Sequence, residues 1–388
     1  MEGLGLSYRL ILLHIFLLTI PRVYGSEGVE KTSALFIFGD STVDPGNNNY
    51  IDTAPENRAN YKPYGQNGFF EAPTGRFSDG RIIVDFIAEH AKLPLIPPYL
   101  EPSADFTNGV NFASGGAGVL PETHKGLAID LSTQLKYFEE VQRSLTEKLG
   151  EAKAKNIITE AVYFISIGSN DYIAGYLANP TMLELHGPGQ YVGMVIGNLT
   201  NAIQTLYHKG ARKFAFLSLS PLGCIPSLRA ANLQGSDDGG CLEAASALAI
   251  GHNTALKNVL TSLEHVLRGF KFSNPDFYNW LDDRLNNTSK YGFKDGVNAC
   301  CGTGPYRGLL TCGGKNKTTD FELCENANDY IWFDAFHPTE RMHQQIADAV
   351  WDGPPSFVGS MSLKDLFFTR EKLTIADIVD IPGGENLQ

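Results

Sequence analysis

Short apolar runs, each followed at once by a polar turn, restrict the possible folds of this chain more than any other feature. The first run, residues 34–38 (Ala-Leu-Phe-Ile-Phe), is broken by Gly39 and Asp40, and Ser41 is the first hydroxyl beyond it. Such a run is typical of a short buried strand. Because open α/β sheets build their sites at the carboxyl ends of strands, Ser41 is a candidate functional residue. A capped turn is the alternative interpretation, since Ser and Asp are common in turns and at N-caps.

Further apolar runs alternate with segments of helical periodicity along the chain. The predicted strands are 34–38, 110–113, 161–167, 214–219 and a short, polar one at 270–272. The predicted helices are 82–91, 131–149, 190–209, 242–267 and 339–351, with a loop over 183–189. This alternation predicts a doubly wound, three-layer α/β sandwich with a mainly parallel five-stranded sheet of flavodoxin-like type.

A second candidate segment lies near the other end of the chain, where Asp334 and His337 are three residues apart. A serine nucleophile needs a base that removes its proton, and the base needs a group that fixes its tautomer and orientation. Asp334 and His337 can supply both functions from one loop. Pro338 disfavours helical geometry at His337 and can open the helix that follows. A loop carboxylate with a solvated histidine is the alternative interpretation.

A glycine-rich turn follows the predicted strand at 110–113 and reads Ser-Gly-Gly-Ala-Gly over residues 114–118. Glycines let the backbone approach a ligand closely, so an amide of this turn could serve in an oxyanion hole. A plain tight turn or a phosphate-binding turn is the alternative. The dinucleotide-binding fingerprint is not matched here, because that motif requires Gly-x-Gly-x-x-Gly at the start of a helix.

Four segments in this order resemble the plant GDSL esterase/lipases, which are SGNH hydrolases. The segments are Phe38-Gly39-Asp40-Ser41, residues 111–118, Ile167-Gly168-Ser169-Asn170-Asp171, and residues 334–340. The resemblance covers nearly the whole mature chain. One departure is Thr42, which stands where the family's name has Leu. That position follows the nucleophile and varies in such enzymes, so we expect activity to be retained.

The resemblance implies roles for individual residues. Ser41 would be the nucleophile of an ester hydrolase, His337 its base, and Asp334 the residue that orients His337. The oxyanion hole would comprise the Ser41 amide, the Asn170 side chain and a glycine amide, for which Gly115 is our first choice and Gly116 the alternative. The substrate would be a small-molecule or lipid ester, and no metal or organic cofactor is required.

Two other functions fit the same residues. An acyltransferase would use the same catalytic groups and pass the acyl group to a specific alcohol instead of water. A secreted binding protein would keep the fold and lack turnover. His343 is a rival base that we interpret as a residue on the helix surface. The segments 291–296 and 299–306 resemble plant members linked to defence, which suggests a role there or in lipid metabolism.

The formal net charge of −12 argues against nucleic acid and against anionic membrane surfaces as partners. Residues 10–20 form an apolar run after Arg9, and a small residue, Gly25, follows where cleavage would be expected. This pattern predicts a cleaved secretory signal at residues 1–25; the apolar run is short for a membrane span, and an uncleaved anchor is the alternative interpretation. We therefore expect a secreted, apoplastic protein with one hydrolase domain over 26–388 and a C-terminal tail from about residue 369. The oligomeric state stays open.

The cysteines and the glycosylation sequons also fit a secreted protein. An even number of cysteines in a secreted chain predicts disulfides, and a zinc site is the rival interpretation. We favour a bridge between Cys224 and Cys241, while the other four cysteines would close the segment before Asp334. Those four are Cys300, Cys301, Cys312 and Cys324. The sequons lie at Asn198, Asn286, Asn287 and Asn316.

Overall fold

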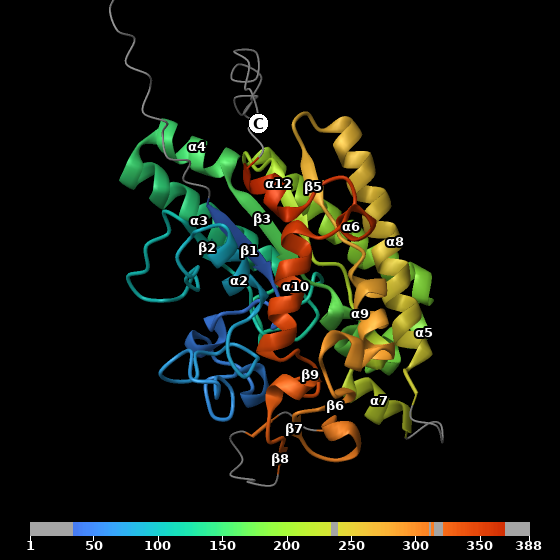
Figure 1. Ribbon diagram of the computed structural model, residues 1–388. Helices are drawn as coiled ribbons and strands as arrows, with labels where there is room; N and C mark the ends of the chain where they lie inside the picture. The colour runs from blue at the N-terminus through green and yellow to red at the C-terminus, as the bar shows by residue number, and fades with distance from the viewer. Residues whose placement is uncertain (1–33, 234–239, 310–311, 314–320, 369–388) are drawn as a thin grey trace, which may run out of the picture. The chain divides into compact units, whose positions relative to one another are not determined.

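A five-stranded, entirely parallel sheet forms the centre of the fold (Figure 1). The computed structural model describes residues 34–233, 240–309, 312–313 and 321–368. In spatial order the strands are β2 (Gly109–Asn111), β1 (Leu35–Gly39), β3 (Val162–Ser166), β4 (Lys213–Phe216) and β5 (Lys271–Ser273). This 2-1-3-4-5 order is that of flavodoxin-like sheets and confirms the predicted fold class. The short strand predicted near 270–272 is present.

Helices cover both faces of the sheet, because apolar strands of a parallel sheet must be buried on both sides. One face carries α2 (Ile83–His90) packed against α10 (Glu340–Asp352), which crosses in front of the sheet in Figure 1. The other helices of eight or more residues are α3 (Leu131–Leu149), α4 (Glu151–Glu160), α6 (Pro188–His208), α7 (Pro226–Leu233), α8 (Glu243–Val266) and α9 (Phe277–Asn286). Among them α3, α6 and α8 form the opposite layer, because consecutive parallel strands are joined by right-handed crossovers.

Local sequence explains the boundaries of several helices. Asp130 caps α3 by accepting a hydrogen bond from the Thr133 amide, and Gly150 ends the helix with a positive φ of 82°. The loop predicted over 183–189 is partly wrong, because the short helix α5 (Pro180–Leu185) extends into it and α6 already starts at Pro188. Asn179 caps α5 through the Met182 amide, and Pro180 occupies its first turn.

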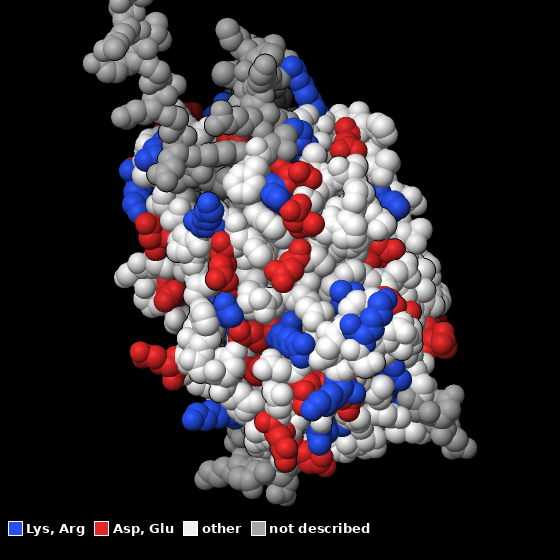
Figure 2. All heavy atoms as spheres, in the orientation of Figure 1, with Lys and Arg blue, Asp and Glu red and all other residues white. Residues whose placement is uncertain are grey.

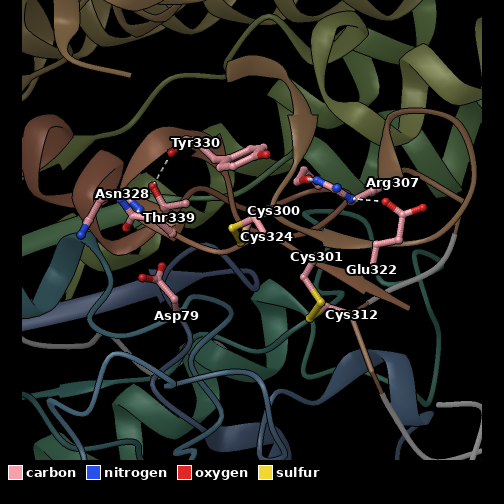
Figure 3. The surroundings of a disulfide bond; sticks show 12 residues. Asp79, Cys300, Cys301, Arg307, Cys312, Glu322, Cys324, Asn328, Tyr330 and Thr339 are labelled. Carbon is pink, nitrogen blue, oxygen red and sulfur yellow. Dashed lines mark hydrogen bonds and ion pairs between the residues drawn. A yellow bond between two sulfur atoms is a disulfide. The ribbon is translucent and has the colours of Figure 1, made fainter. Parts of the chain in front are cut away.

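A cysteine-rich layer lies next to the sheet and just before the Asp334 segment. It contains two small sheets, β6 (Asp295–Ala299) with β9 (Tyr330–Trp332) and β7 (Cys301–Gly302) with β8 (Glu322–Leu323), which the sequence did not predict. Two buried disulfides, Cys300–Cys324 and Cys301–Cys312, hold this layer together (Figure 3). The bridge expected between Cys224 and Cys241 is also present.

Other expectations concern the surface and the two ends of the chain. The expected signal segment, the tail from residue 369 and Asn316 lie outside the described residues. Asn198, Asn286 and Asn287 are exposed on α6 and at the end of α9. Figure 2 shows basic and acidic side chains interspersed over the face in view. No helix within the described ranges combines the length and apolar character needed to cross a bilayer.

Gln134 of α3 clamps the end of β1 immediately before Ser41. Its side chain is fully buried; Oε1 accepts from the Gly39 amide at 2.9 Å, and Nε2 donates to the carbonyls of Gly39 and Ile129, each at 2.8 Å. Backbone groups at a strand end lack partners in the sheet, and the Gln134 side chain hydrogen-bonds to such groups here. The position of Ser41 therefore depends on a side chain from α3, a helix that is distant in the sequence.

We predict that Gln134→Leu lowers the free energy of unfolding by about 3 kcal/mol, because the buried Gly39 amide and Ile129 carbonyl lose the bonds from Gln134, while the Gly39 carbonyl keeps its bond from the Ser114 amide. Gln142→Leu on the same helix is the matched control, since Gln142 is half-buried and donates one bond, to the Lys209 carbonyl. We expect the control to cost about 1 kcal/mol. Denaturant titration of both variants checks the prediction, and equal losses would contradict it.

Candidate active site

Ser41 lies in a tight turn directly after β1. Asp40 starts the turn: its amide donates to the Ser166 carbonyl at 3.1 Å, and its side chain accepts from the Thr42 amide at 3.0 Å. Gly39 is required before it, because a Cβ at this position would overlap the Ser166 carbonyl and the Val43 side chain. The turn leaves the Ser41 hydroxyl at the wall of a pocket.

Asp334 and His337 occupy the loop between β9 and α10, as the sequence predicted. The Asp334 carboxylate is fully buried, and its Oδ1 accepts from the backbone amides of Phe336 at 2.9 Å and His337 at 2.8 Å. These two bonds fold the loop around the carboxylate. The helix α10 then begins at Glu340, after Thr339 caps it by accepting from the Met342 amide. Pro338 therefore precedes the helix rather than opening it.

The structure brings Ser41, His337 and Asp334 into one hydrogen-bonded chain, although Ser41 and His337 are 296 residues apart. His337 Nδ1 lies 2.8 Å from Asp334 Oδ1 and 2.9 Å from Oδ2, and His337 Nε2 lies 2.7 Å from Ser41 Oγ. A carboxylate only accepts, so Nδ1 carries the proton and Nε2 is free to accept one from Ser41. In this arrangement an imidazole can act as base towards a serine hydroxyl.

The charges around the chain of hydrogen bonds favour an ionised Asp334. Burial alone would raise the pKa of Asp334, but the charge of His337 and hydrogen bonds from His337, Phe336 and Tyr64 hold it below its usual value. The neighbouring Asp40 shows the opposite balance, because burial raises its pKa despite bonds to Thr42. The ring of Phe77 lies over the His337 imidazole with centroids 4.7 Å apart.

A pocket of about 250 Å³ opens beside Ser41 and His337. Its wall is mostly apolar on the side of β4, α9 and α10, where Leu217, Phe277, Leu281 and Ile346 contribute. Polar groups line another part of the wall: Glu56, Asn57 and His124. Pockets that bind small molecules typically combine an apolar lining with a few convergent polar groups.

Comparisons with known proteins agree with this geometry. The family model of the GDSL-like lipase/acylhydrolases matches residues 35–350. The chain belongs to this family. It is 47% identical over 343 residues to GDSL esterase/lipase 1 of Arabidopsis thaliana, covering 87% of this chain and 91% of that protein. It is 48% identical over 346 residues to GDSL esterase/lipase 5 of Arabidopsis thaliana, covering 88% and 89% respectively.

A further relative comes from another plant. The chain is 45% identical over 358 residues to the GDSL lipase of Tanacetum cinerariifolium, which covers 92% of this chain and 93% of that protein. The resemblance noted from the four sequence segments is thereby confirmed, and the protein is a carboxylic ester hydrolase of the GDSL esterase/lipase family.

The two glycines considered for the oxyanion hole differ in their surroundings. The Gly115 amide donates to Asp44 Oδ2 at 3.0 Å, so it is already paired inside the protein. Among the described residues that line the pocket, Gly116 occurs and Gly115 does not. Gly116 has a positive φ of 84°, and its carbonyl accepts a bond from His124 Nδ1 at 2.7 Å. This geometry favours Gly116, which was our alternative, over Gly115, and the role of either stays a prediction.

Asn170 is placed at the pocket as expected. It follows β3 and lies at the start of the π-helical segment η3 (Asp171–Leu177). Its Nδ2 donates to the Ala117 carbonyl at 3.0 Å, which fixes the orientation of the amide and leaves the second N–H of the same nitrogen for another acceptor. The side chain thus bridges the third strand to the glycine-rich turn.

Two buried carboxylates that sequence reasoning missed hold the glycine-rich turn. Asp44 accepts from the amides of Gly46 and Asn47, each at 2.7 Å, as well as from Gly115. Asp171 accepts from the Val119 and Leu120 amides and from Thr123 Oγ1. Burial raises the pKa of each carboxyl to about 6, although these hydrogen bonds offset part of the effect. The available sequence signal was their position: Asp171 is the last residue of a motif segment, and Asp44 lies three residues after Ser41.

His343 is not on the helix surface, so this expectation was wrong. The side chain is fully buried because α2 packs over α10, and its Nδ1 accepts from the Ile83 amide at 3.2 Å. Burial and the nearby charge of His337 lower the pKa of His343 to about 3. A histidine held neutral, with Nδ1 occupied, is a poor base, which removes His343 as a rival to His337.

Arg76 and Asp79 hold the loop before α2. Arg76 forms a buried bidentate pair with Asp85, at 2.8 and 2.7 Å. Asp79 accepts from the Glu340 amide at 2.7 Å, and Figure 3 shows it facing the segment of Thr339. The loop therefore grips the first residue of α10, three positions after His337.

We predict that Asp79 makes the protein more stable at pH 5 than at pH 7. Burial, with the charge of Glu340, raises the pKa of Asp79 to about 6 from an unfolded value of 3.8. Between these values the folded state binds the extra proton, so stability falls as the pH rises through about 6. The loss from pH 5 to pH 7 is about 1 kcal/mol.

Asp79→Asn is the test, since the amide oxygen still accepts from Glu340 and no longer titrates. The stability difference between Asp79→Asn and the wild type should shift by about 1 kcal/mol in favour of the variant from pH 5 to pH 7. Guanidinium unfolding at both pH values measures it, and a difference that stays constant with pH would contradict the prediction.

Proposed function

We propose that this hydrolase is a serine esterase that works through an acyl-serine intermediate, with Ser41 as nucleophile, His337 as general base and Asp334 as the orienting carboxylate. The observation that carries the proposal is the continuous hydrogen-bonded chain from Asp334 through His337 to Ser41 at the wall of a pocket. The same three groups, in the same order of contact, activate serine in unrelated hydrolases.

The reaction follows from the positions of the protons. Ser41 Oγ attacks the ester carbonyl while His337 Nε2 accepts the hydroxyl proton, and the resulting imidazolium is stabilised by Asp334. His337 then gives the proton to the leaving alcohol as the C–O bond breaks, which yields the acyl-serine. A water molecule attacks the acyl-serine, with His337 again as base, and releases the carboxylic acid and free Ser41.

Three donors would stabilise the oxyanion of the tetrahedral intermediate. They are the backbone amides of Ser41 and Gly116 and the second N–H of the Asn170 side chain. Gly116 and Asn170 both line the pocket that contains Ser41, and the Ala117 carbonyl fixes the Asn170 amide. Preorganised donors of this kind act on charge that develops only in the transition state.

The pocket favours esters with a short or medium acyl chain. Its volume of about 250 Å³ is below the range of ~300–1,000 Å³ that is typical of ligand pockets. The apolar part, with Leu217 and Phe277, suits the acyl chain, and the polar part, with Glu56 and His124, suits a polar alcohol. We further propose that the protein is secreted, which the three disulfides support, and that it acts in plant defence or lipid metabolism.

Ser41→Ala should reduce the hydrolysis of p-nitrophenyl butyrate by at least about 1,000-fold, because the nucleophile is lost. The wild type should hydrolyse the butyrate faster than the palmitate ester. Ser356→Ala, an exposed serine on α11 (Pro355–Val358), is the control and should keep wild-type activity. Equal activity of the wild type and Ser41→Ala would overturn the proposal. Turnover that appears only with an added alcohol acceptor would indicate an acyltransferase.

Asn170→Ala should lower kcat about 100-fold with little change in KM, because the side chain acts on the oxyanion of the transition state. Asn170→Asp should be at least as impaired, since a carboxylate would repel the developing negative charge. Steady-state kinetics on the same ester measures both variants, with thermal unfolding to verify the fold. A change confined to KM would rule out the oxyanion role.

A further inference from the structure

Tyr64 contacts the buried carboxylate of the candidate triad from a distant part of the chain. Its hydroxyl donates to Asp334 Oδ2 at 2.7 Å across a separation of 270 residues, and the side chain is 1% exposed. No motif in the sequence marks Tyr64. Asp334 Oδ1 accepts from the His337 and Phe336 amides, whereas Oδ2 accepts from Tyr64 and also lies 2.9 Å from His337 Nδ1.

The direction of the Tyr64 hydrogen bond follows from its partner. Asp334 is held ionised, and a carboxylate can only accept, so the phenolic proton points to Asp334. Tyr64 also belongs to the same buried cluster as Cys312. Cys312 is held in place by its disulfide with Cys301, which Figure 3 shows in the cysteine-rich layer.

The ring of Tyr64 is immobilised by its neighbours. It packs edge-to-face against Phe333 at 5.5 Å and against Phe77 at 6.0 Å, and Phe77 in turn lies over the His337 ring. Tyr61 completes the group, with its ring 5.4 Å away. Packing of this kind holds the Tyr64 ring in one orientation, so its hydroxyl is already placed to donate to the Asp334 carboxylate.

We propose that Tyr64 is a positioning residue for the Asp334–His337 pair: it fixes the rotation of the Asp334 carboxylate and takes up part of its charge. This inference rests on the proposed catalytic function. Tyr64 does not touch the reacting atoms, and it acts on catalysis through Asp334.

Two consequences follow for the pH dependence. Without the phenolic donor, the carboxylate keeps more of its negative charge for His337, and the imidazolium form is held more strongly. The Tyr64 bond is also one of the factors that lower the pKa of Asp334, so its loss raises that pKa. Because the acid limb of kcat/KM reports the base, the first effect moves this limb to higher pH; the second has the same origin, a carboxylate that holds protons more strongly. The other titratable groups that act on this pair, Asp40 and His343, remain the same in the variant.

Tyr64→Phe tests the proposal, because it removes the hydroxyl and keeps the ring. We expect kcat to fall about tenfold with KM changed less than about twofold, and the acid limb to rise by about half a pH unit or more. Tyr61→Phe is the matched control, since it removes a hydroxyl from the same aromatic group, and it should show the wild-type pH profile. An acid limb unchanged in Tyr64→Phe, whatever the loss of activity, would overturn the inference.

A second readout separates this inference from the proposed function. The low-field proton resonance of His337 Nδ1 reports its hydrogen bond to Asp334 and requires no turnover. In a Ser41→Ala background, Tyr64→Phe should shift this resonance and the pH at which it changes, whereas Tyr61→Phe should not. If Tyr64→Phe leaves the resonance as it is in the Ser41→Ala parent, the role of Tyr64 is overturned. This outcome is independent of the esterase proposal, which has its own test.

Discussion

The Asp334 carboxylate is a negative charge with no exposure to solvent, and the surrounding structure must compensate for it. Removing an ion from water is costly unless it is paired and hydrogen-bonded. Here the pairing comes from His337, and the hydrogen bonds come from two loop amides and from Tyr64. Because every one of these donors must be in place, the burial of one carboxylate determines the conformation of the loop, the tautomer of His337 and the position of a distant tyrosine.

The same principle, that buried polar groups need hydrogen-bond partners, applies to the turns on the other side of the site. Irregular segments follow β1, β2 and β3, and their backbone groups are buried where no strand can pair with them. Gln134, Asp44 and Asp171 satisfy those groups from inside the protein. Each of these side chains bonds to several backbone atoms at once, so the turns that carry Ser41, Gly116 and Asn170 are fixed relative to the sheet.

Much of this arrangement was predictable, because it depends on local sequence. Apolar runs located all five strands, and helical periodicity located α3 to the residue. The motifs singled out Ser41, Asp334 and His337, which the structure joins by hydrogen bonds, because each lies at a strand end or in a loop that local sequence defines. What depended on distant contacts was not predictable.

The failures share one cause, which is contact between parts of the chain that lie far apart. His343 was misplaced because α2 covers it. The loop over 183–189 was misjudged where α5 forms, and the bond from Tyr64 to Asp334 joins residues 270 positions apart. The Gly115 amide likewise finds its partner in Asp44, 71 residues away. Tyr64 packs in one buried cluster with Cys300, Cys301 and Cys312 of the cysteine-rich layer. That layer has a consequence for how the site responds to reduction. The central sheet ends at Ser273, before Cys300, and the loop of Asp334 and His337 follows Cys324. The two disulfides therefore cross-link the segment between the sheet and that loop, so a reducing agent would act first on the support of the histidine and its carboxylate.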